Sequence, residues 1–315
     1  MRLWLHMRGL WPRYTLLAPA PFVLWAIFFA LRGQLRWEQL AMAVAAVGLA
    51  YGNAHTKRLY LGMLPMGFLG LVYDGMRFVD RSGMRPENVH VCDLRDAELR
   101  YFGMESAGRA MTWPDYFYEN PSLALDVFCA IPYGAFLFVS IGYGIFLYFR
   151  GLDSQQRFTW GFLIVNLLGF LTYRFYPAAP PWYFHEYGCA VDLATPASEG
   201  THLARVDELL GIPFFAGMYS RSSNVFGAMP SLHVAYPLLM LIEGYKHHGK
   251  VGKAALVGFY GWMCFSAVYL DHHWVLDVVA GSVYAAVVAA CLRKLIVKEP
   301  ASRLDVLSSQ RGLGT

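Results

Sequence analysis

The chain has 315 residues, of which 57% are hydrophobic and 16% aromatic, whereas charged residues make up only 15%. This composition is far from that of a soluble domain and is typical of a protein whose helices lie in a membrane. The net charge of +4 comes from basic residues scattered over loops between apolar runs, which argues against a nucleic-acid-binding face.

Eight apolar runs are candidates for membrane-crossing helices, each of which needs about 20 mostly apolar residues to cross a hydrocarbon core of about 30 Å. In chain order they are 15–31, 38–53, 59–76, 121–149, 159–176, 231–245, 254–270 and 274–292. The first two are short, and Pro19 and Pro21 interrupt the first. We therefore predict an all-α, polytopic membrane bundle with about eight transmembrane helices.

The positions of the basic residues indicate the topology. An N-terminus on the cytoplasmic side places basic loop residues such as Arg58, Arg150 and Lys250 in the cytoplasm, as the positive-inside rule requires. The same topology puts two long loops, about 78–120 and 177–230, on the opposite face.

Two of the five cysteines, Cys92 and Cys189, fall in these outer loops. A disulfide between them would form if that face is oxidising, but the pairing cannot be read from the sequence. The other three cysteines fall within apolar runs, where a small buried side chain is the ordinary interpretation.

Ionisable residues at membrane depth are costly and indicate function, and in this chain they cluster. His233 begins one apolar run, His273 precedes another, and Asp277 lies just inside that second run. Between the two histidines, 231–245 and 254–270 form one helical hairpin, which returns the chain to the face that it left. Both histidines are therefore expected on one face of the membrane.

The spacing of these residues favours phosphoryl chemistry. Residues four apart lie on one face of a helix, so the Asp277 carboxylate can reach the His273 imidazole. A carboxylate on one ring nitrogen sets the tautomer and raises the basicity of the other nitrogen, which prepares histidine as a nucleophile toward phosphorus. His233 would protonate the leaving alkoxide as a general acid. Interfacial histidines are the competing interpretation, which fits any one of these residues alone better than it fits the combination.

The residues around the histidines include candidate phosphate ligands. Pro230 suits the first position of a helix, and the free backbone N–H groups that follow it, with the Ser231 hydroxyl, would form an anion site. The pair could equally serve only to start the helix. Arg174 could supply a fixed positive charge for a phosphate or extend its side chain to the lipid headgroups. Arg221 is a second candidate cation.

Three segments carry a family resemblance, namely Tyr-Pro-Ala-Ala-Pro-Pro-Trp-Tyr at 176–183, Phe-Gly-Ala-Met-Pro-Ser-Leu-His at 226–233 and Tyr-Leu-Asp-His-His-Trp-Val-Leu-Asp at 269–277. They resemble motifs of the type 2 phosphatidic acid phosphatase (PAP2) superfamily, and most closely those of its inositol phosphorylceramide synthases. The resemblance, which extends over roughly 73–290, implies a six-helix core and a reaction without a metal or other cofactor.

Residue by residue, the resemblance makes His273 the nucleophile, Asp277 its partner, and His233 the acid that protonates the leaving group. Ser231 would contact the phosphate, and His272 would be a supporting residue. On this basis the chain divides into four parts. They are N-terminal transmembrane helices at 1–78, an extramembrane amphipathic or loop segment at 79–120, a catalytic transmembrane core at 121–298 and a polar cytoplasmic tail at 299–315.

The chain departs from the pattern of the phosphatases in this superfamily. Leu232 replaces the glycine of the second motif, and Ala267 follows Ser266 where the third motif has an arginine. Tyr176 stands at the position of the first motif's arginine and takes its place among the candidate phosphate-site residues. Two phosphate-binding cations are thus missing, and similar losses mark the synthase branch.

The resemblance therefore favours a membrane phosphotransferase that passes a phospholipid headgroup phosphate, with phosphoinositol as a candidate, through His273 to a lipid hydroxyl. Ceramide and diacylglycerol are the candidate acceptors, and the active site is expected on the non-cytoplasmic face. Two alternatives stay open, a lipid-phosphate phosphatase that uses water as the acceptor and a non-catalytic lipid-binding or transport protein. The expected partners are the donor lipid, the acceptor lipid and the membrane, without nucleic acid.

Overall fold

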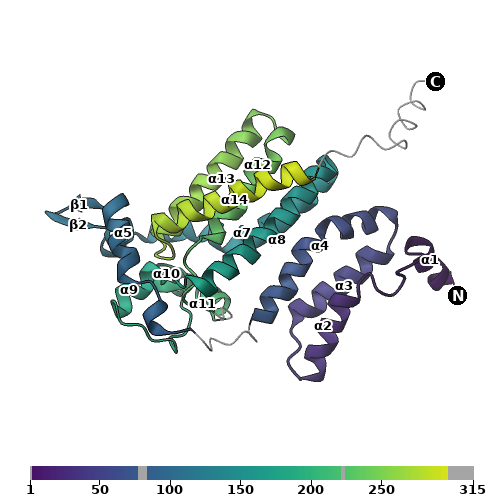
Figure 1. Cartoon of the computed structure of the whole chain (residues 1–315), viewed down its shortest axis with the longest axis horizontal. Coiled ribbons are helices and arrows are strands. Elements are labelled where there is room, and N and C mark those ends of the chain that lie inside the picture. The colour runs from purple at the N-terminus through teal and green to yellow at the C-terminus, as the bar shows by residue number, and fades with distance from the viewer. Residues whose placement is uncertain (1, 77–83, 221–223, 297–315) are drawn as a thin grey trace.

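The computed structural model describes residues 2–76, 84–220 and 224–296. Four helices begin the chain, namely α1 (Arg2–Leu10), α2 (Ala20–Leu31), α3 (Trp37–Tyr51) and α4 (Ala54–Gly75). α2 packs on α3 and α3 on α4, and α4 runs along α8 (Leu152–Phe175) of the central bundle (Figure 1). The predicted run 15–31 becomes α2 only from Ala20, because proline lies at the N-cap and again in the first turn.

The central bundle is built around one short helix. Its members besides α8 are α7 (Leu123–Arg150), α12 (Leu232–Gly244), α13 (Lys250–Tyr269) and α14 (Val275–Leu295). α12 packs against α7, α8, α13 and α14, and its Tyr236, Leu239 and Met240 belong to the main apolar core. α4 also packs on α7 and α8, so these helices form one bundle of six. The start of α12, where His233 lies, is therefore enclosed by other helices.

A buried carboxylate anchors the other end of α12. The Glu243 carboxylate accepts hydrogen bonds from Arg157 Nε at 2.8 Å and from Arg293 Nε at 3.1 Å. Glu243 has 2% of its surface exposed, so both guanidinium groups compensate a charge that would otherwise be costly to bury. The chain then continues through the 3-10 helix η3 (Tyr245–His247) into α13.

The prediction of an all-α membrane bundle is confirmed, although the lengths of the helices vary. All eight predicted runs contain a helix, and four helices in the described part of the chain, α7, α8, α13 and α14, are long and apolar enough to cross a membrane. α2, α3 and α12 have 12, 15 and 13 residues, fewer than the approximately 20 that a crossing needs. α4 has 22 residues, but charged residues such as Arg58 and Asp74 lie in both of its ends.

Short elements gather at one end of the bundle (Figure 1), and we call the described residues of 84–120 and 177–230 the cap. The elements before α7 are η2 (Pro86–Asn88), α5 (Cys92–Phe102), β1 (Met104–Ser106), β2 (Arg109–Met111) and α6 (Trp113–Glu119). The two strands pair antiparallel, with Met104 opposite Met111. The elements after α8 are α9 (Pro181–Tyr187), α10 (Gly200–Leu210) and α11 (Phe214–Tyr219).

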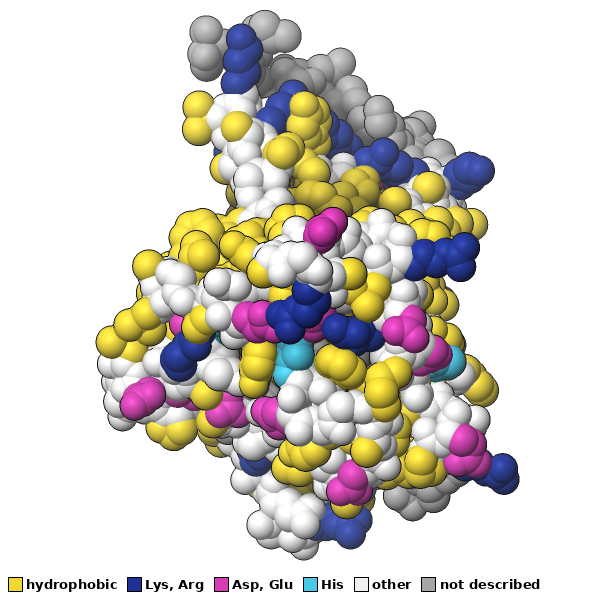
Figure 2. Space-filling model, turned by 90° about the vertical axis from the view of Figure 1, so that its left-hand side faces the viewer, with side chains coloured by type: hydrophobic (Ala, Val, Ile, Leu, Met, Phe, Trp, Pro, Cys, Tyr) yellow, Lys and Arg dark blue, Asp and Glu magenta, His cyan; other side chains and the backbone are white. Residues whose placement is uncertain are grey.

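Backbone bridges and one disulfide tie the cap together. His90 and Gly227 both form isolated parallel bridges with Ala178, which joins three distant segments. Cys92 and Cys189 form a disulfide with their Cα atoms 5.5 Å apart, which resolves the pairing that the sequence left open. Figure 2, which faces this end of the molecule, shows charged and histidine side chains among hydrophobic ones. This mixed surface suits an end of the bundle that meets water and headgroups.

Candidate active site

His233 and His273 face each other where the cap meets the bundle. His233 lies in the first turn of α12, and His273 lies in the loop between α13 and α14. His233 Nδ1 is 3.4 Å from His273 Nε2, and the ring centroids are 5.6 Å apart. The α12–α13 hairpin therefore brings the two histidines together, as the spacing of the sequence predicts.

The neighbours of His273 decide which ring nitrogen carries a proton. Nδ1 is 2.9 Å from the Ala228 carbonyl oxygen and 3.5 Å from Asp277 Oδ2. Both of these atoms are acceptors, so Nδ1 carries a proton and donates it, and in the neutral form of the ring Nε2 has the lone pair. That lone pair faces His233. The expected contact of Asp277 is present, but the Ala228 carbonyl is the closer partner of the imidazole.

Asp277 has a second contact that fixes its position. Its Oδ2 accepts the Trp274 backbone N–H at 2.8 Å and so caps the first turn of α14. The residue has 0% of its surface exposed, and its position beside His273 is therefore set by the helix start. A carboxylate so held stabilises the positive charge that His273 would acquire when Nε2 attacks phosphorus.

α12 and α14 approach each other closely at Gly281. The Ser231 backbone N–H donates to the Asp277 carbonyl at 2.9 Å, which joins the start of α12 to the first turn of α14. A Cβ atom on Gly281 would lie 2.1 Å from the Ser231 carbonyl oxygen, a backbone atom. Only glycine fits there, and this contact keeps the His233 helix against the Asp277 helix.

We predict that Gly281→Ala lowers both stability and activity. The methyl group must push the start of α12 away from α14, which should cost about 1–3 kcal/mol as overpacking does. Because His233 moves with that helix, turnover should fall as well. Gly258→Ala on α13 is the matched control, since its Cβ meets nothing within 4 Å. Thermal unfolding in detergent and lipid turnover would measure the effect, and equal values for both variants would contradict it.

Ser231 lies at the place where a phosphate could bind. It is the N-cap residue of α12, so the first N–H groups of that helix follow it and lack partners within the helix. Its hydroxyl is buried and has no hydrogen-bond partner in the described part of the chain. A free hydroxyl at the positive end of a helix is a suitable anion ligand.

Comparison with known proteins identifies the family. The family model described as "PAP2 superfamily" matches residues 113–291, which include both histidines and Asp277. The chain belongs to the PAP2 superfamily. A relative from Bacteroides thetaiotaomicron, phosphoinositol dihydroceramide synthase, is 35% identical over 270 residues, covering 82% of this chain and 86% of the relative.

Fungal relatives match a shorter region. The catalytic subunit of inositol phosphorylceramide synthase from Saccharomyces cerevisiae is 34% identical over 167 residues, which cover 52% of this chain and 41% of the yeast protein. No solved structure shows significant similarity. The chain is thus a membrane enzyme of the PAP2 phosphotransferase type, in the branch of the inositol phosphorylceramide synthases, and the non-catalytic alternative is set aside.

Two of the positions at which this PAP2 chain departs from the phosphatase pattern, Ala267 and Tyr176, have defined contacts. Ala267 is fully buried, and its carbonyl oxygen accepts the His273 backbone N–H at 3.0 Å. Tyr176 stacks on His90 of the cap, with ring centroids 3.8 Å apart. Tyr176, which stands where the resemblance places the arginine of the phosphatases, is thus paired with an aromatic ring of the cap.

His272 points away from its neighbour in the sequence. Its Nε2 donates to the Glu199 carbonyl at 2.8 Å, and its ring stacks on Tyr219. Burial lowers the pKa of His272 to about 3, so the ring is neutral at physiological pH. His272 thus connects the loop that carries His273 to α10 and α11.

Of the two candidate arginines, only Arg174 lies within the described residues. Arg174 is exposed near the end of α8, and within the described residues it has no hydrogen bond or ion pair. Its position therefore suits extension to the headgroup layer better than contact with a phosphate beside His273. Arg221 lies outside the described residues, as does the predicted tail at 299–315.

The structure adds a buried polar network that the sequence did not reveal as a unit. Asp126, at the start of α7, accepts hydrogen bonds from His202 Nδ1, Arg205 Nε and Tyr269 Oη, each at 2.8 Å. His202 and Arg205 are three residues apart on α10, a spacing that places them on one face. This three-residue spacing is the feature of the sequence that could have indicated His202 and Arg205 as a pair.

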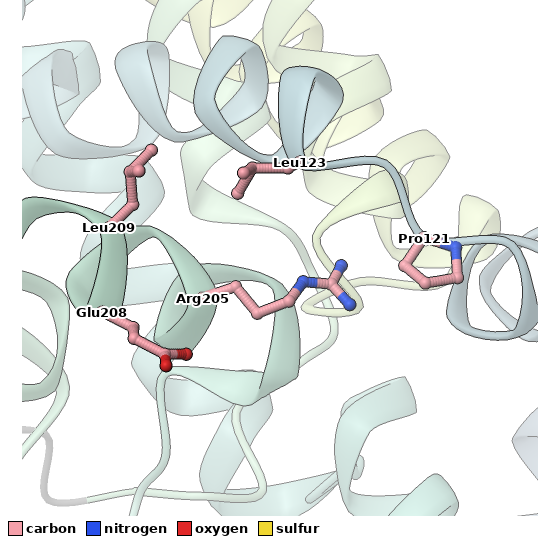
Figure 3. A pocket seen from close by; sticks show the side chains of 5 residues that line it. All are labelled: Pro121, Leu123, Arg205, Glu208 and Leu209. Carbon is pink, nitrogen blue, oxygen red and sulfur yellow. The ribbon is translucent and has the colours of Figure 1, made fainter.

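A cavity of about 470 Å³ opens beside this network (Figure 3). Its lining residues are Pro121, Leu123, Arg205, Glu208 and Leu209. In Figure 3, Arg205 reaches across it from α10 toward the chain that leads into α7. The cavity borders the membrane helix α7 and is lined by residues other than the histidine pair.

Glu98 is another buried polar residue whose contacts the sequence does not indicate. From α5 of the cap, its carboxylate accepts the backbone N–H groups of Val275 at 2.9 Å and Leu276 at 3.0 Å. Burial raises the pKa of Glu98 to about 7. The cap thereby binds the first turn of α14, two residues from Asp277.

Proposed function

We propose that this chain transfers phosphoinositol from a phospholipid donor to the hydroxyl of a ceramide-type acceptor through a phosphohistidine on His273. The observation that carries the proposal is the arrangement of the two imidazoles, in which the lone pair of His273 Nε2 faces His233 Nδ1 at 3.4 Å. The substrates are taken from the bacterial relative, which is named a phosphoinositol dihydroceramide synthase.

In the first step, His273 Nε2 attacks the donor phosphorus, and the bond from phosphorus to the diacylglycerol oxygen breaks. His233 gives a proton to the departing alkoxide, so that diacylglycerol leaves as a neutral alcohol. The 3.4 Å separation of the two nitrogens is too small to hold a phosphoryl group between them, so donor binding must move the rings apart. The buried Asp277 carboxylate balances the positive charge on the phosphorylated imidazole.

In the second step, the acceptor hydroxyl attacks phosphorus and the bond to Nε2 breaks. His233, now neutral, takes the hydroxyl proton, which returns both histidines to their starting states. Donor and acceptor use the same site in turn, so one histidine pair serves both half-reactions. The cap excludes water from the intermediate during the exchange, and its position at one end of the bundle supports an active site on the non-cytoplasmic face.

A panel of donor and acceptor lipids tests this function. Purified protein with phosphatidylinositol and ceramide should form phosphoinositol-ceramide and diacylglycerol in equal amounts, which mass spectrometry of the lipid extract would measure. Other phospholipid donors, and diacylglycerol as the acceptor, define the selectivity. If inositol phosphate or free phosphate were the only phosphorus product, the enzyme would be a hydrolase of the phosphatase type, and transfer would be ruled out.

A further inference from the structure

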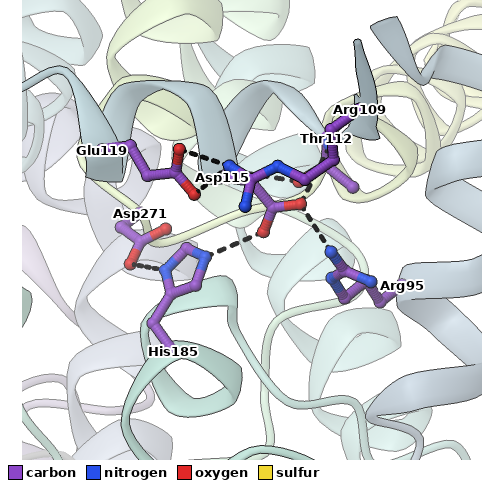
Figure 4. Close-up of polar contacts among 7 residues, drawn as sticks. All are labelled: Arg95, Arg109, Thr112, Asp115, Glu119, His185 and Asp271. Carbon is purple, nitrogen blue, oxygen red and sulfur yellow. Dashed lines mark hydrogen bonds and ion pairs between the residues drawn. The ribbon is translucent and has the colours of Figure 1, made fainter. Parts of the chain in front are cut away.

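His185 joins two carboxylates that approach it from different parts of the chain (Figure 4). From α9, its Nδ1 lies 2.7 Å from Asp271 Oδ2, and its Nε2 lies 3.0 Å from Asp115 Oδ1 on α6. The three side chains are 7%, 1% and 8% exposed, respectively. The contacts are therefore shielded from water and from salt, unlike a surface ion pair.

With Asp115 and Asp271 both ionised, the geometry places a positive charge on the ring of His185. Both of its nitrogens face carboxylate oxygens, which accept hydrogen bonds, so both nitrogens carry protons. These hydrogen bonds outweigh the effect of burial and raise the pKa of His185 to about 9. Tyr118 stacks on the ring with a centroid separation of 4.2 Å, and the ring of Phe184 lies at its edge.

Other charged groups surround the three residues. Arg95 Nη2 of α5 donates to Asp115 Oδ2 at 2.8 Å, and the Thr112 backbone N–H donates to the same oxygen. Further titratable groups act on Asp115, on Asp271 or on their neighbours, namely Glu98 on α5, Glu186 on α9, Glu199 before α10 and His202 on α10. Two carboxylates are thus balanced by Arg95 and His185, and loss of the His185 charge would leave Asp271 without its cation.

Asp271 forms the turn from which both active-site loop histidines emerge. Its backbone φ is +68°, in the left-handed region that residues other than glycine rarely adopt. Its carbonyl oxygen accepts the Trp182 backbone N–H at 3.0 Å. After this turn, His272 points to the Glu199 carbonyl and His273 to the Ala228 carbonyl. The direction of His273 Nε2 therefore depends on a conformation that local sequence alone does not favour.

We propose that His185 is a positioning residue, whose cation between Asp115 and Asp271 holds the 271–273 turn so that His273 Nε2 is aimed at the donor phosphorus. This inference rests on the function proposed above. The residue touches no reacting atom and acts through Asp271. It gives the cap, which supplies Asp115 and His185, a direct part in setting the geometry of the nucleophile.

Three variants test the inference. In His185→Gln, two buried carboxylates lose their shared cation, so the 271–273 turn should loosen. The double variant His185→Gln/Asp271→Asn removes one carboxylate, and its amides can rebuild the chain of hydrogen bonds from residue 271 through residue 185 to Asp115. Arg109→Gln is the control, because it breaks the exposed Arg109–Glu119 ion pair, whose Glu119 lies on α6 as Asp115 does.

Single-turnover formation of phosphohistidine is the readout, with donor affinity measured separately. We expect His185→Gln to slow labelling of His273 by about 10–100-fold with little change in donor affinity, since misplacing a reacting atom costs rate. The double variant should recover to within about threefold of the wild type, a coupling that neighbouring residues show and independent ones do not. Arg109→Gln should label at the wild-type rate.

The pH dependence of the labelling rate is a second readout. A purely structural role of His185 would leave this dependence unchanged. The His185 cation is present below its folded pKa of about 9 and is lost as the pH rises through that value. Wild-type labelling should therefore fall above about pH 9, and the double variant should lack this fall.

The outcomes separate the two proposals. If the wild type labels His273 and His185→Gln labels it equally fast, or if the double variant recovers nothing, the positioning inference is wrong. If the wild type carries no label on His273 while transfer proceeds, the proposed function itself is wrong. Should His185→Gln fail to fold, the double variant and the wild-type pH profile still decide, because both measurements use folded protein.

Discussion

His273→Ala should abolish transfer and remove the covalent label at the same time. Without the Nε2 lone pair that faces His233, there is no nucleophile to accept the phosphoinositol group. We expect turnover to fall by at least about 10⁴-fold, as loss of a nucleophile does in other enzymes that form covalent intermediates. A headgroup-labelled donor and rapid quenching would trap the intermediate as an acid-labile, base-stable label on the wild-type protein.

The control for this experiment is His55→Ala, which removes an exposed histidine in the first turn of α4. That variant should turn over lipid and take up label as the wild type does. Thermal unfolding of His273→Ala should show that the bundle still folds, because the imidazole contributes little to the apolar core. Retained turnover in His273→Ala would rule out covalent transfer through this residue.

His233→Ala should slow the first step in a way that depends on the leaving group. His233 gives a proton to a departing alkoxide, and general acid catalysis of this kind contributes about 10²–10⁴-fold. A lipid donor, whose alkoxide leaves poorly, should therefore react more slowly by that factor. An aryl ester of inositol phosphate, whose nitrophenolate leaves without a proton, should lose less than about tenfold.

The aryl donor separates the roles of the two histidines. His273→Ala should be inactive toward both donors, since each requires the nucleophile, whereas His233→Ala should regain most of its label with the aryl donor. Release of nitrophenolate can be followed by absorbance in parallel with the labelling. Equal losses of His233→Ala with lipid and aryl donors would show that His233 is not the general acid.

Local patterns were sufficient to predict the central geometry of the site. The i, i+4 spacing predicts that Asp277 reaches His273, and Asp277 Oδ2 lies 3.5 Å from His273 Nδ1. The hairpin formed by α12 and α13 predicts that His233 and His273 meet, because two antiparallel helices return the chain to its starting face. Both inferences depend only on helix geometry over short stretches of chain.

The contacts that support the site could not be predicted in this way. Glu98 binds the start of α14 across 177 residues, and Asp115 meets His185 across 70. Such contacts depend on how the cap folds back on the bundle, and no local periodicity encodes that arrangement. Arg174 is a predicted contact that the structure does not support. Its charge suggests a phosphate ligand, but its exposed position on α8 argues against that role.

The sequence by itself determined the all-α membrane architecture and the PAP2 family, and it indicated the three residues that we propose for the centre of the reaction. These follow from apolar runs, from helical spacing and from motif resemblance, each of which can be identified within a short stretch of the sequence. Only the tertiary structure decided that the Ala228 carbonyl holds His273 Nδ1, that Gly281 lets α12 touch α14, and that His185 binds the Asp271 turn. The physical reason is that these contacts join residues distant in sequence, whose distances are set by packing of the whole bundle and its cap.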